Sequence, residues 1–318
     1  MNAPIEDFLQ RQLAEQAPRA KSLCVTLLGD ALAPHGGAIW LGDLIELTSP
    51  LGVNERLLRT SVFRLVSQGW LQSERIGRRS LYTLSPQGLR LTAHASARIY
   101  IGPPSDWNGE WTLVILPRTG NGQLAERAEL RRELVWEGFG VVAPGVFAHP
   151  QADAGTAHEI LEKLEIPGRA LVLRGHELPG AGGLPLSSLV QLCWNLDELA
   201  AQYRDFSARY AALQALLARQ APSPAQAFTL RTLLIHGWRR IVLNDPQLPA
   251  PLLPPDWPGL AARRLCGALY WQLFAASETH LQAIASRDNA AYTPLAPGAL
   301  SRFEGAPAEA AALAAQQA

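Results

Sequence analysis

Arginines and short polar side chains recur between residues 54 and 64 at spacings that place many of them along one side of a helix. Guanidinium groups pair with phosphate oxygens and guanine edges, and hydroxyl or amide groups bond to either. The pattern therefore predicts recognition of a polyanion, above all duplex DNA. The candidate contacts are Asn54, Arg56, Arg59, Thr60, Ser61 and Arg64.

A second basic group follows directly. Arg75, Arg78 and Arg79 surround Gly77, between short runs at 70–71 and 81–84 that are typical of strands. Such a hairpin could reach the phosphate backbone or the minor groove beside the helix. The alternative is an ordinary amphipathic helix and hairpin whose arginines are only solvated. The arginine-rich turn favours nucleic acid.

The elements that must position these side chains can be predicted from the same stretch. Asn54 is a typical helix cap and Gly69 a typical residue just past a helix end. A period of 100° per residue places the apolar residues on one face, Arg59 at its border and the other polar residues opposite. Those apolar residues are Leu58, Val62, Leu65 and Val66. Helices at 21–29 and 38–47 are expected before it, so the segment reads as a winged helix-turn-helix followed by a helix from 86 to about 99.

The rest of the chain predicts two further domains. After a linker at 101–106, apolar strands and amphipathic helices alternate in the order βαββαβ, a ferredoxin-like arrangement, with one strand or two short ones around Pro144 and Gly145. Helical patterns follow at 189–217, 223–243 and 259–286, and the tail after Pro294 is expected to fray. The fold class is α+β multidomain. The expected domains are 19–100, 105–180 and 185–290.

Composition narrows the class of protein. Lys and Arg number 28, as do Asp and Glu, but residues 19–98 hold ten basic and five acidic side chains, a net +5 that leaves −5 for the remainder. Three widely separated cysteines predict free thiols in a reducing compartment. Neither a membrane-spanning apolar run nor signal-peptide features are found, so a cytoplasmic protein is expected.

Motifs for catalysis are missing. The sequence has no nucleophile elbow, Walker loop, dinucleotide fingerprint or HExxH motif. His35 and His94 have no partners at ligand spacing and are expected in surface or capping roles. His236 is most simply a helical histidine bonded to a neighbour. We therefore expect no enzyme activity, no metal and no cofactor.

Several long motifs resemble the PaaX family of transcriptional repressors of phenylacetic acid catabolism. They are WLGDLI (40–45), NERLLRTSVFRLV (54–66), GWL (69–71), RIGRRS (75–80), WNGEWT (107–112), YRDF (203–206), RTLLIH (231–236) and PPDWPG (254–259). The resemblance implies a Cas2-like central domain and a homodimeric repressor that phenylacetyl-CoA releases from its operator. The first central strand ends in Leu116, Pro117 and Arg118, where a Cas2 nuclease would carry a metal-binding acid, so nuclease activity is not expected.

An acyl-CoA effector would need arginines for its phosphates and an apolar pocket for its aryl group. Residues near the end of the second C-terminal helix, with the Arg263–Arg264 pair, offer both, although helix-end arginines are more often solvated or paired. The candidates are His236, Trp238, Arg239, Arg240 and Arg264. Two competing classes remain: an acyl-CoA-processing enzyme fused to a DNA-binding module, and a constitutive architectural DNA binder.

Overall fold

The computed structural model describes residues 3–102, 106–117, 124–152, 154–178 and 186–307 of the 318-residue chain. Its contacts divide the chain into two compact units. The first combines residues 1–101, 204–240 and 259–318, and the second combines 102–203 and 241–258. The N-terminal and C-terminal segments therefore share one unit, and the three domains expected from the sequence stay a prediction; the expected boundaries at 105, 180 and 185 lie outside the described residues.

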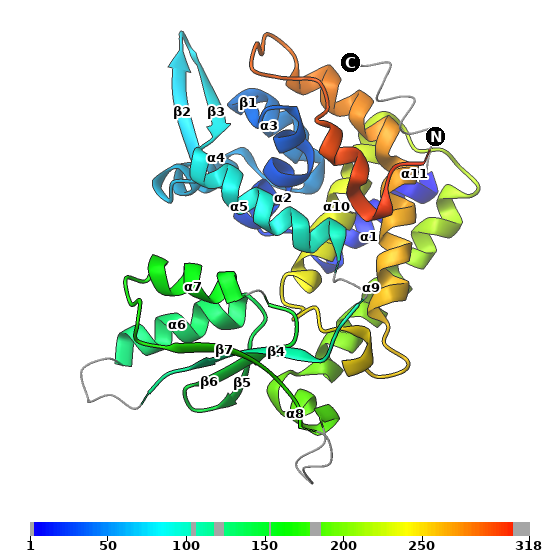
Figure 1. The fold of residues 1–318 in the computed structure, drawn as a ribbon. Coiled ribbons are helices and arrows are strands. Elements are labelled where there is room, and N and C mark those ends of the chain that lie inside the picture. Colours follow the sequence, from blue (N-terminus) through cyan, green and yellow to red (C-terminus); the bar gives the residue numbers. More distant parts are fainter. Residues whose placement is uncertain (1–2, 103–105, 118–123, 153, 179–185, 308–318) are drawn as a thin grey trace. The chain divides into compact units, whose positions relative to one another are not determined.

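The first unit begins with short helices and a small antiparallel sheet of strand order β1-β3-β2, whose β2–β3 hairpin projects beyond the helices (Figure 1). The elements are α1 (Ala3–Glu15), α2 (Ala20–Leu27), β1 (Ala38–Trp40), α3 (Leu41–Thr48), α4 (Glu55–Ser67), β2 (Leu71–Ile76), β3 (Arg79–Leu84) and α5 (Pro86–Ser96). Helix α4 packs against α2.

The N-terminal lead, for which the sequence left a loose segment or a short helix open, is the helix α1, which buries Ile5 and Phe8. Two local expectations for this segment are wrong. Gly29 does not end the first helix, because α2 continues through a π-helical turn, η1 (Leu28–Leu32), and a short 3-10 turn to Gly36 at φ +87°. The expected helix at 38–47 starts as a strand, in which Ile39 pairs with Tyr82, because the hairpin supplies a sheet edge that local sequence does not reveal.

The rest of the first unit is built from long C-terminal helices. They are α9 (Leu196–Leu217) from Arg204 onward, α10 (Pro224–Val242) up to Arg240, α11 (Gly259–Ala285) and the 3-10 segment η6 (Pro297–Glu304). Part of the tail expected to fray, residues 297–304, forms η6, where Arg302 and Phe303 are buried. The tail after residue 307 lies outside the described residues. Of the predicted free thiols, Cys24 and Cys266 are buried, and burial raises the pKa of Cys24 to about 12.

The second unit contains the predicted βαββαβ order. Its elements are β4 (Glu110–Ile115), α6 (Leu124–Trp136), β5 (Gly140–Ala143), β6 (Val146–His149), α7 (Ala154–Lys163) and β7 (Leu171–His176). Two short strands, not one, flank Pro144 and Gly145. The antiparallel sheet has the order β5-β6-β4-β7, and α6 and α7 cover one face of it, where Val114, Leu130 and Phe147 share a core (Figure 1).

The opposite face of this sheet carries an aromatic core. Trp111 packs there with Leu248 and with Val190 of α8 (Leu186–Cys193). The single helix expected at 189–217 is therefore wrong: the chain breaks after Cys193, and Asn195 caps α9 by accepting a hydrogen bond from the backbone N–H of Glu198 at 3.2 Å. Among the described residues, no helix combines the length and apolarity needed to cross a bilayer.

Candidate nucleic-acid interface and effector site

Helix α4 is fixed at both ends and along one face. The Asn54 side chain accepts a hydrogen bond from the Leu57 backbone N–H at 2.9 Å, which confirms the predicted cap. Leu58, Val62 and Leu65 are almost completely buried. After the helix, the chain turns at Gly69, whose φ of +74° suits a glycine. The opposite face is thereby held outward.

That outward face carries two arginines in solvent. Arg56 and Arg64 are exposed, and neither is paired with an acid among the described residues. Thr60 is exposed, and its hydroxyl donates to the Arg56 carbonyl at 2.9 Å, which leaves its lone pairs to accept. Ser61 departs from the expectation: it is buried, and its hydroxyl donates to the Leu57 carbonyl. At 100° per residue, Ser61 lies next to the buried Leu58 and Val62, and this places it on the core side.

Arg59 is exposed but already paired. Its guanidinium lies 2.6 Å from the Glu55 carboxylate, one helical turn earlier. Both side chains are more than half exposed, so water screens the pair and it contributes little to stability. A phosphate could replace the Glu55 carboxylate as the partner of Arg59 at small cost. Arg56 and Arg64 could bind a phosphate without breaking an ion pair.

The three hairpin arginines differ in their freedom. Strands β2 and β3 pair Ile76 with Arg79, so only Gly77 and Arg78 form the turn. Arg75 and Arg79, which the sequence placed around the turn, therefore lie on the strands. Arg78 is exposed at the tip of the hairpin. Arg79 stacks over the Trp40 ring at 4.3 Å and lies 3.3 Å from Asp288, which holds it against the body of the unit.

Sequence reasoning missed an exposed aromatic ring on α4. Phe63 is 72% exposed, and Leu57 is 54% exposed on the same helix. The available signal was its phase, since Phe63 falls outside the apolar stripe that the helical period defines. An apolar side chain on a DNA-reading face can contact a thymine methyl group.

The candidate effector residues do not form one site. The Nδ1 atom of His236 lies 2.9 Å from the Thr26 hydroxyl, which agrees with the prediction of a helical histidine bonded to a neighbour. Burial, Arg239 and Arg240 lower the pKa of His236 to about 4. Trp238 is buried and donates its indole N–H to the Ile99 carbonyl, so it lies in the core.

The arginines of that set are also dispersed. Arg239 donates to the Ser22 carbonyl at 3.0 Å and to the Thr26 hydroxyl at 3.1 Å, which joins α10 to α2. Arg240 is exposed on α10. Arg264, together with Arg263, instead lines a cavity of about 550 Å³ beside α11 and η6.

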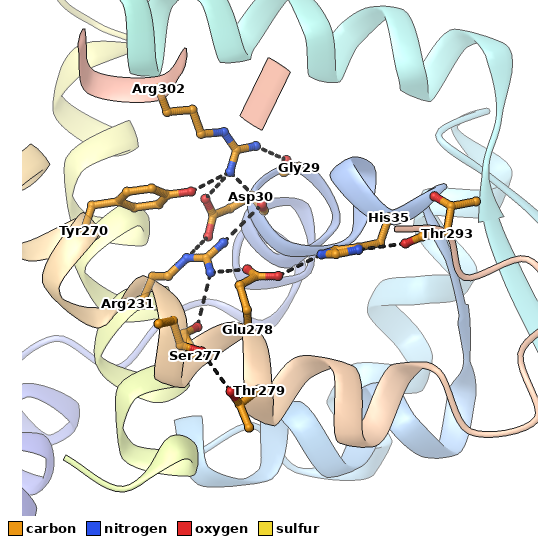
Figure 2. Close-up of polar contacts among 11 residues, drawn as sticks. Gly29, Asp30, His35, Arg231, Tyr270, Ser277, Glu278, Thr279, Thr293 and Arg302 are labelled. Carbon is orange, nitrogen blue, oxygen red and sulfur yellow. Dashed lines mark hydrogen bonds and ion pairs between the residues drawn. The ribbon is translucent and has the colours of Figure 1, made fainter. Parts of the chain in front are cut away.

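A buried ion cluster, which sequence reasoning also missed, ties the N-terminal and C-terminal segments of the first unit together (Figure 2). Asp30 of η1 accepts from Arg231 and from Arg302, each at 3.1 Å, and from the Tyr100 hydroxyl at 2.6 Å. Arg231 also pairs with Glu278. The signal was available in part: Asp30, Arg231 and Glu278 interrupt otherwise apolar helical patterns.

The electrostatics of the cluster are balanced. Burial alone would raise the pKa of Glu278, but Arg231 and His35 lower it to about 2. His35 bonds Glu278 at 2.8 Å and the Thr293 carbonyl at 2.9 Å, so the expected surface or capping role is wrong for it. Two guanidiniums and two carboxylates thus neutralise one another inside the protein, which buried charges require.

The described end of the central strand carries no acidic side chain. β4 ends at Ile115, followed by Leu116 and Pro117, so no acid stands at that end; Arg118 lies outside the described residues. Within the part of the chain that the structure describes, no three His, Cys, Asp or Glu side chains gather as a metal site.

Comparison with known proteins identifies the class and then the family. Three family profiles match: PaaX-like protein at residues 19–88, PaaX protein central Cas2-like domain at 104–182, and PaaX-like protein C-terminal domain at 194–283. The molecule is therefore an α+β protein with a Cas2-like central domain and a helical C-terminal part.

One curated relative and one solved structure extend this result. The chain is 36% identical over 275 residues to the Transcriptional repressor PaaX of Escherichia coli (strain K12), covering 86% of each chain. The chain belongs to the PaaX family. A solved structure, the uncharacterized protein Rv0674 from Mycobacterium tuberculosis, is similar in fold, with a TM-score of 0.50 and 23% identity over 82% of this chain and 99% of that one.

Proposed function

We propose that the chain is a DNA-binding transcriptional repressor of phenylacetate catabolic genes, acting in the cytoplasm as a homodimer and released from its operator by phenylacetyl-CoA. The repressor role is that of its relative in Escherichia coli. The observation that carries the proposal is the outward face of α4, with Arg56, Thr60 and Arg64 beside a hairpin tipped by Arg78.

The arrangement suits a winged helix-turn-helix. In it, α4 would enter the major groove, where Arg56 and Arg64 can bond phosphates or guanine edges and Thr60 can accept. Arg78 at the hairpin tip would meet the flanking backbone, with Arg75 behind it. Asn54 and Arg59 would assist at the groove edge, whereas Ser61 and Arg79 mainly hold the protein's own structure.

Dimerisation and induction complete the proposal. Two copies related by a twofold axis would present two α4 helices to half-sites about one helical turn apart, so the operator should be near-palindromic. Phenylacetyl-CoA would release DNA by binding preferentially to a geometry in which the two helices no longer match those half-sites.

The DNA contacts are testable with selected operator duplexes. Sites are first enriched from random duplexes, and affinity is then measured by fluorescence anisotropy. Arg64→Ala should weaken operator binding by more than ~1 kcal/mol, and Arg78→Ala should lower the salt slope of binding by about 0.9, the value of one phosphate contact. Arg219→Ala, which removes an exposed arginine far along the chain, is the control. Wild-type affinity and slope in both test variants would remove the helix and hairpin from the interface.

We also propose that the chain is not an enzyme and needs no cofactor. Incubation with phenylacetyl-CoA should release no more free coenzyme A thiol than a protein-free sample does. Turnover above that background would favour the alternative, an acyl-CoA-processing enzyme joined to a DNA-binding module.

A further inference from the structure

A cavity of about 550 Å³ lies within the first unit where η6 runs beside α11, and we call it the α11 cavity. Its volume lies in the range of small-molecule sites. Its walls come from residues 263–275 of α11, from the end of η6 and from Pro307. They include Arg263, Arg264, Ala268, Trp271, Phe303 and Glu304.

The walls combine positive charge with aromatic surface. Arg264 is exposed, and Arg263 donates to the Tyr100 carbonyl while its guanidinium lies 5.4 Å from the Phe303 ring centre. Two arginines against Glu304 leave a net positive lining. The side chains of Trp271 and Phe303, both mostly buried, supply flat apolar surface. This chemistry suits an anion that carries an aromatic or acyl group.

One residue of the wall, Trp271, carries a buried polar atom without a partner. The indole N–H of Trp271 is buried, and no described residue accepts a hydrogen bond from it. A buried donor without an acceptor is costly, and functional sites commonly retain such groups for a ligand.

The η6 wall is held in an unusual conformation. Phe303 and Glu304 have φ angles of +48° and +72°, a region that side chains other than glycine seldom adopt. Gly267 permits the close approach of this wall, because a Cβ there would lie 3.0 Å from the Phe303 Cβ. The side chain before Phe303 is Arg302, which donates to the Asp30 carbonyl at 2.9 Å and the Tyr270 hydroxyl at 2.8 Å (Figure 2).

We propose that the α11 cavity is the effector site: it binds an organic anion that joins an aromatic or acyl group to phosphate, with Arg264 and Arg263 at the anion and Trp271 and Phe303 at the apolar part. This assignment rests on the proposed function, which supplies the effector class. A ligand that displaces Phe303 acts on the backbone that positions Arg302, and through Arg302 on Asp30 in η1, beside the α2 helix that supports α4.

The test is calorimetric titration of the full chain with phenylacetyl-CoA. Arg264→Glu reverses the exposed charge, and Ala268→Trp fills the cavity from an exposed position. Each should weaken binding about 10-fold or more, the effect of losing one charge-assisted hydrogen bond or the space for the ligand. The controls are Arg219→Glu and Ala283→Trp, exposed positions away from the cavity lining, and these should stay within about two-fold of wild type.

The outcomes separate the site from the function. Wild-type affinity in both folded cavity variants would overturn the α11 cavity while leaving phenylacetyl-CoA as the effector. A wild-type protein that binds its operator but no phenylacetyl-CoA would overturn the cavity assignment and leave DNA binding intact. Thermal melting checks that each variant folds; if Ala268→Trp does not, Arg264→Glu decides alone, since Arg264 is exposed.

Discussion

Replacing Asp30 by Asn should strongly destabilise the first unit, because this one carboxylate neutralises two buried guanidiniums. Arg231 and Arg302 each lie 3.1 Å from it, and its side chain is 4% exposed. Asn keeps the shape but removes the charge, and its amide NH₂ group would face donors. Only Glu278 would then remain to balance two buried arginines.

The size of the effect follows from that geometry. Removing one partner of a buried ion pair typically costs about 3–5 kcal/mol, because the remaining charge stays desolvated. The exposed pair of Glu55 and Arg59 offers a matched comparison, since both side chains are more than half exposed. Glu55→Gln removes the same charge and should cost no more than about 0.5 kcal/mol.

Urea unfolding followed by circular dichroism measures both changes. Asp30→Asn should lower the free energy of unfolding by several-fold more than Glu55→Gln does. A loss below about 1 kcal/mol for Asp30→Asn would refute the cluster as a structural anchor, because it would mean that water or rearranged side chains solvate the arginines at little cost.

Further predictions concern pH and backbone space. The pKa of His236 is lowered from 6.5 to about 4, so as the pH falls this histidine is protonated in the unfolded chain before it is protonated in the folded chain. The contribution of neutral His236 to the free energy of unfolding is therefore complete above pH 6.5 and falls by about 3 kcal/mol towards pH 4. His236→Gln should flatten that part of a melting-temperature profile, and an unchanged slope would contradict it. Gly88→Ala should cost more than about 1 kcal/mol, because its Cβ would lie 2.2 Å from the Trp70 carbonyl oxygen. Gly42→Ala meets no atom within 4 Å and should be neutral or slightly stabilising.

The sequence predicted the features that depend on interactions within short segments of the chain. The Asn54 cap, the apolar face of α4 and the βαββαβ order all follow from periodicity and capping chemistry within short segments. Long-range pairing could not be foreseen in the same way. Strand β1 exists because β3 offers it an edge, and η6 is ordered because Arg302 reaches Asp30, 272 residues away along the chain.

The candidate site shows the same division. Helical phase placed Arg56, Thr60 and Arg64 outward, but it could not reveal that Glu55 pairs with Arg59 or that Trp40 holds Arg79. For the effector, the residues near the end of the second C-terminal helix, His236 and Trp238 among them, drew attention to a segment that forms the core. The charged and aromatic lining of the α11 cavity emerges only when η6 packs beside α11.

The most direct test of the central claim is operator binding with and without phenylacetyl-CoA. Fluorescence anisotropy with a selected near-palindromic duplex should show tight binding by the full chain, and saturating phenylacetyl-CoA should weaken it by about 10-fold or more, within the usual range of allosteric coupling. Affinity for the operator that stays unchanged by phenylacetyl-CoA, or binding no tighter than to random duplex, would contradict an effector-released repressor.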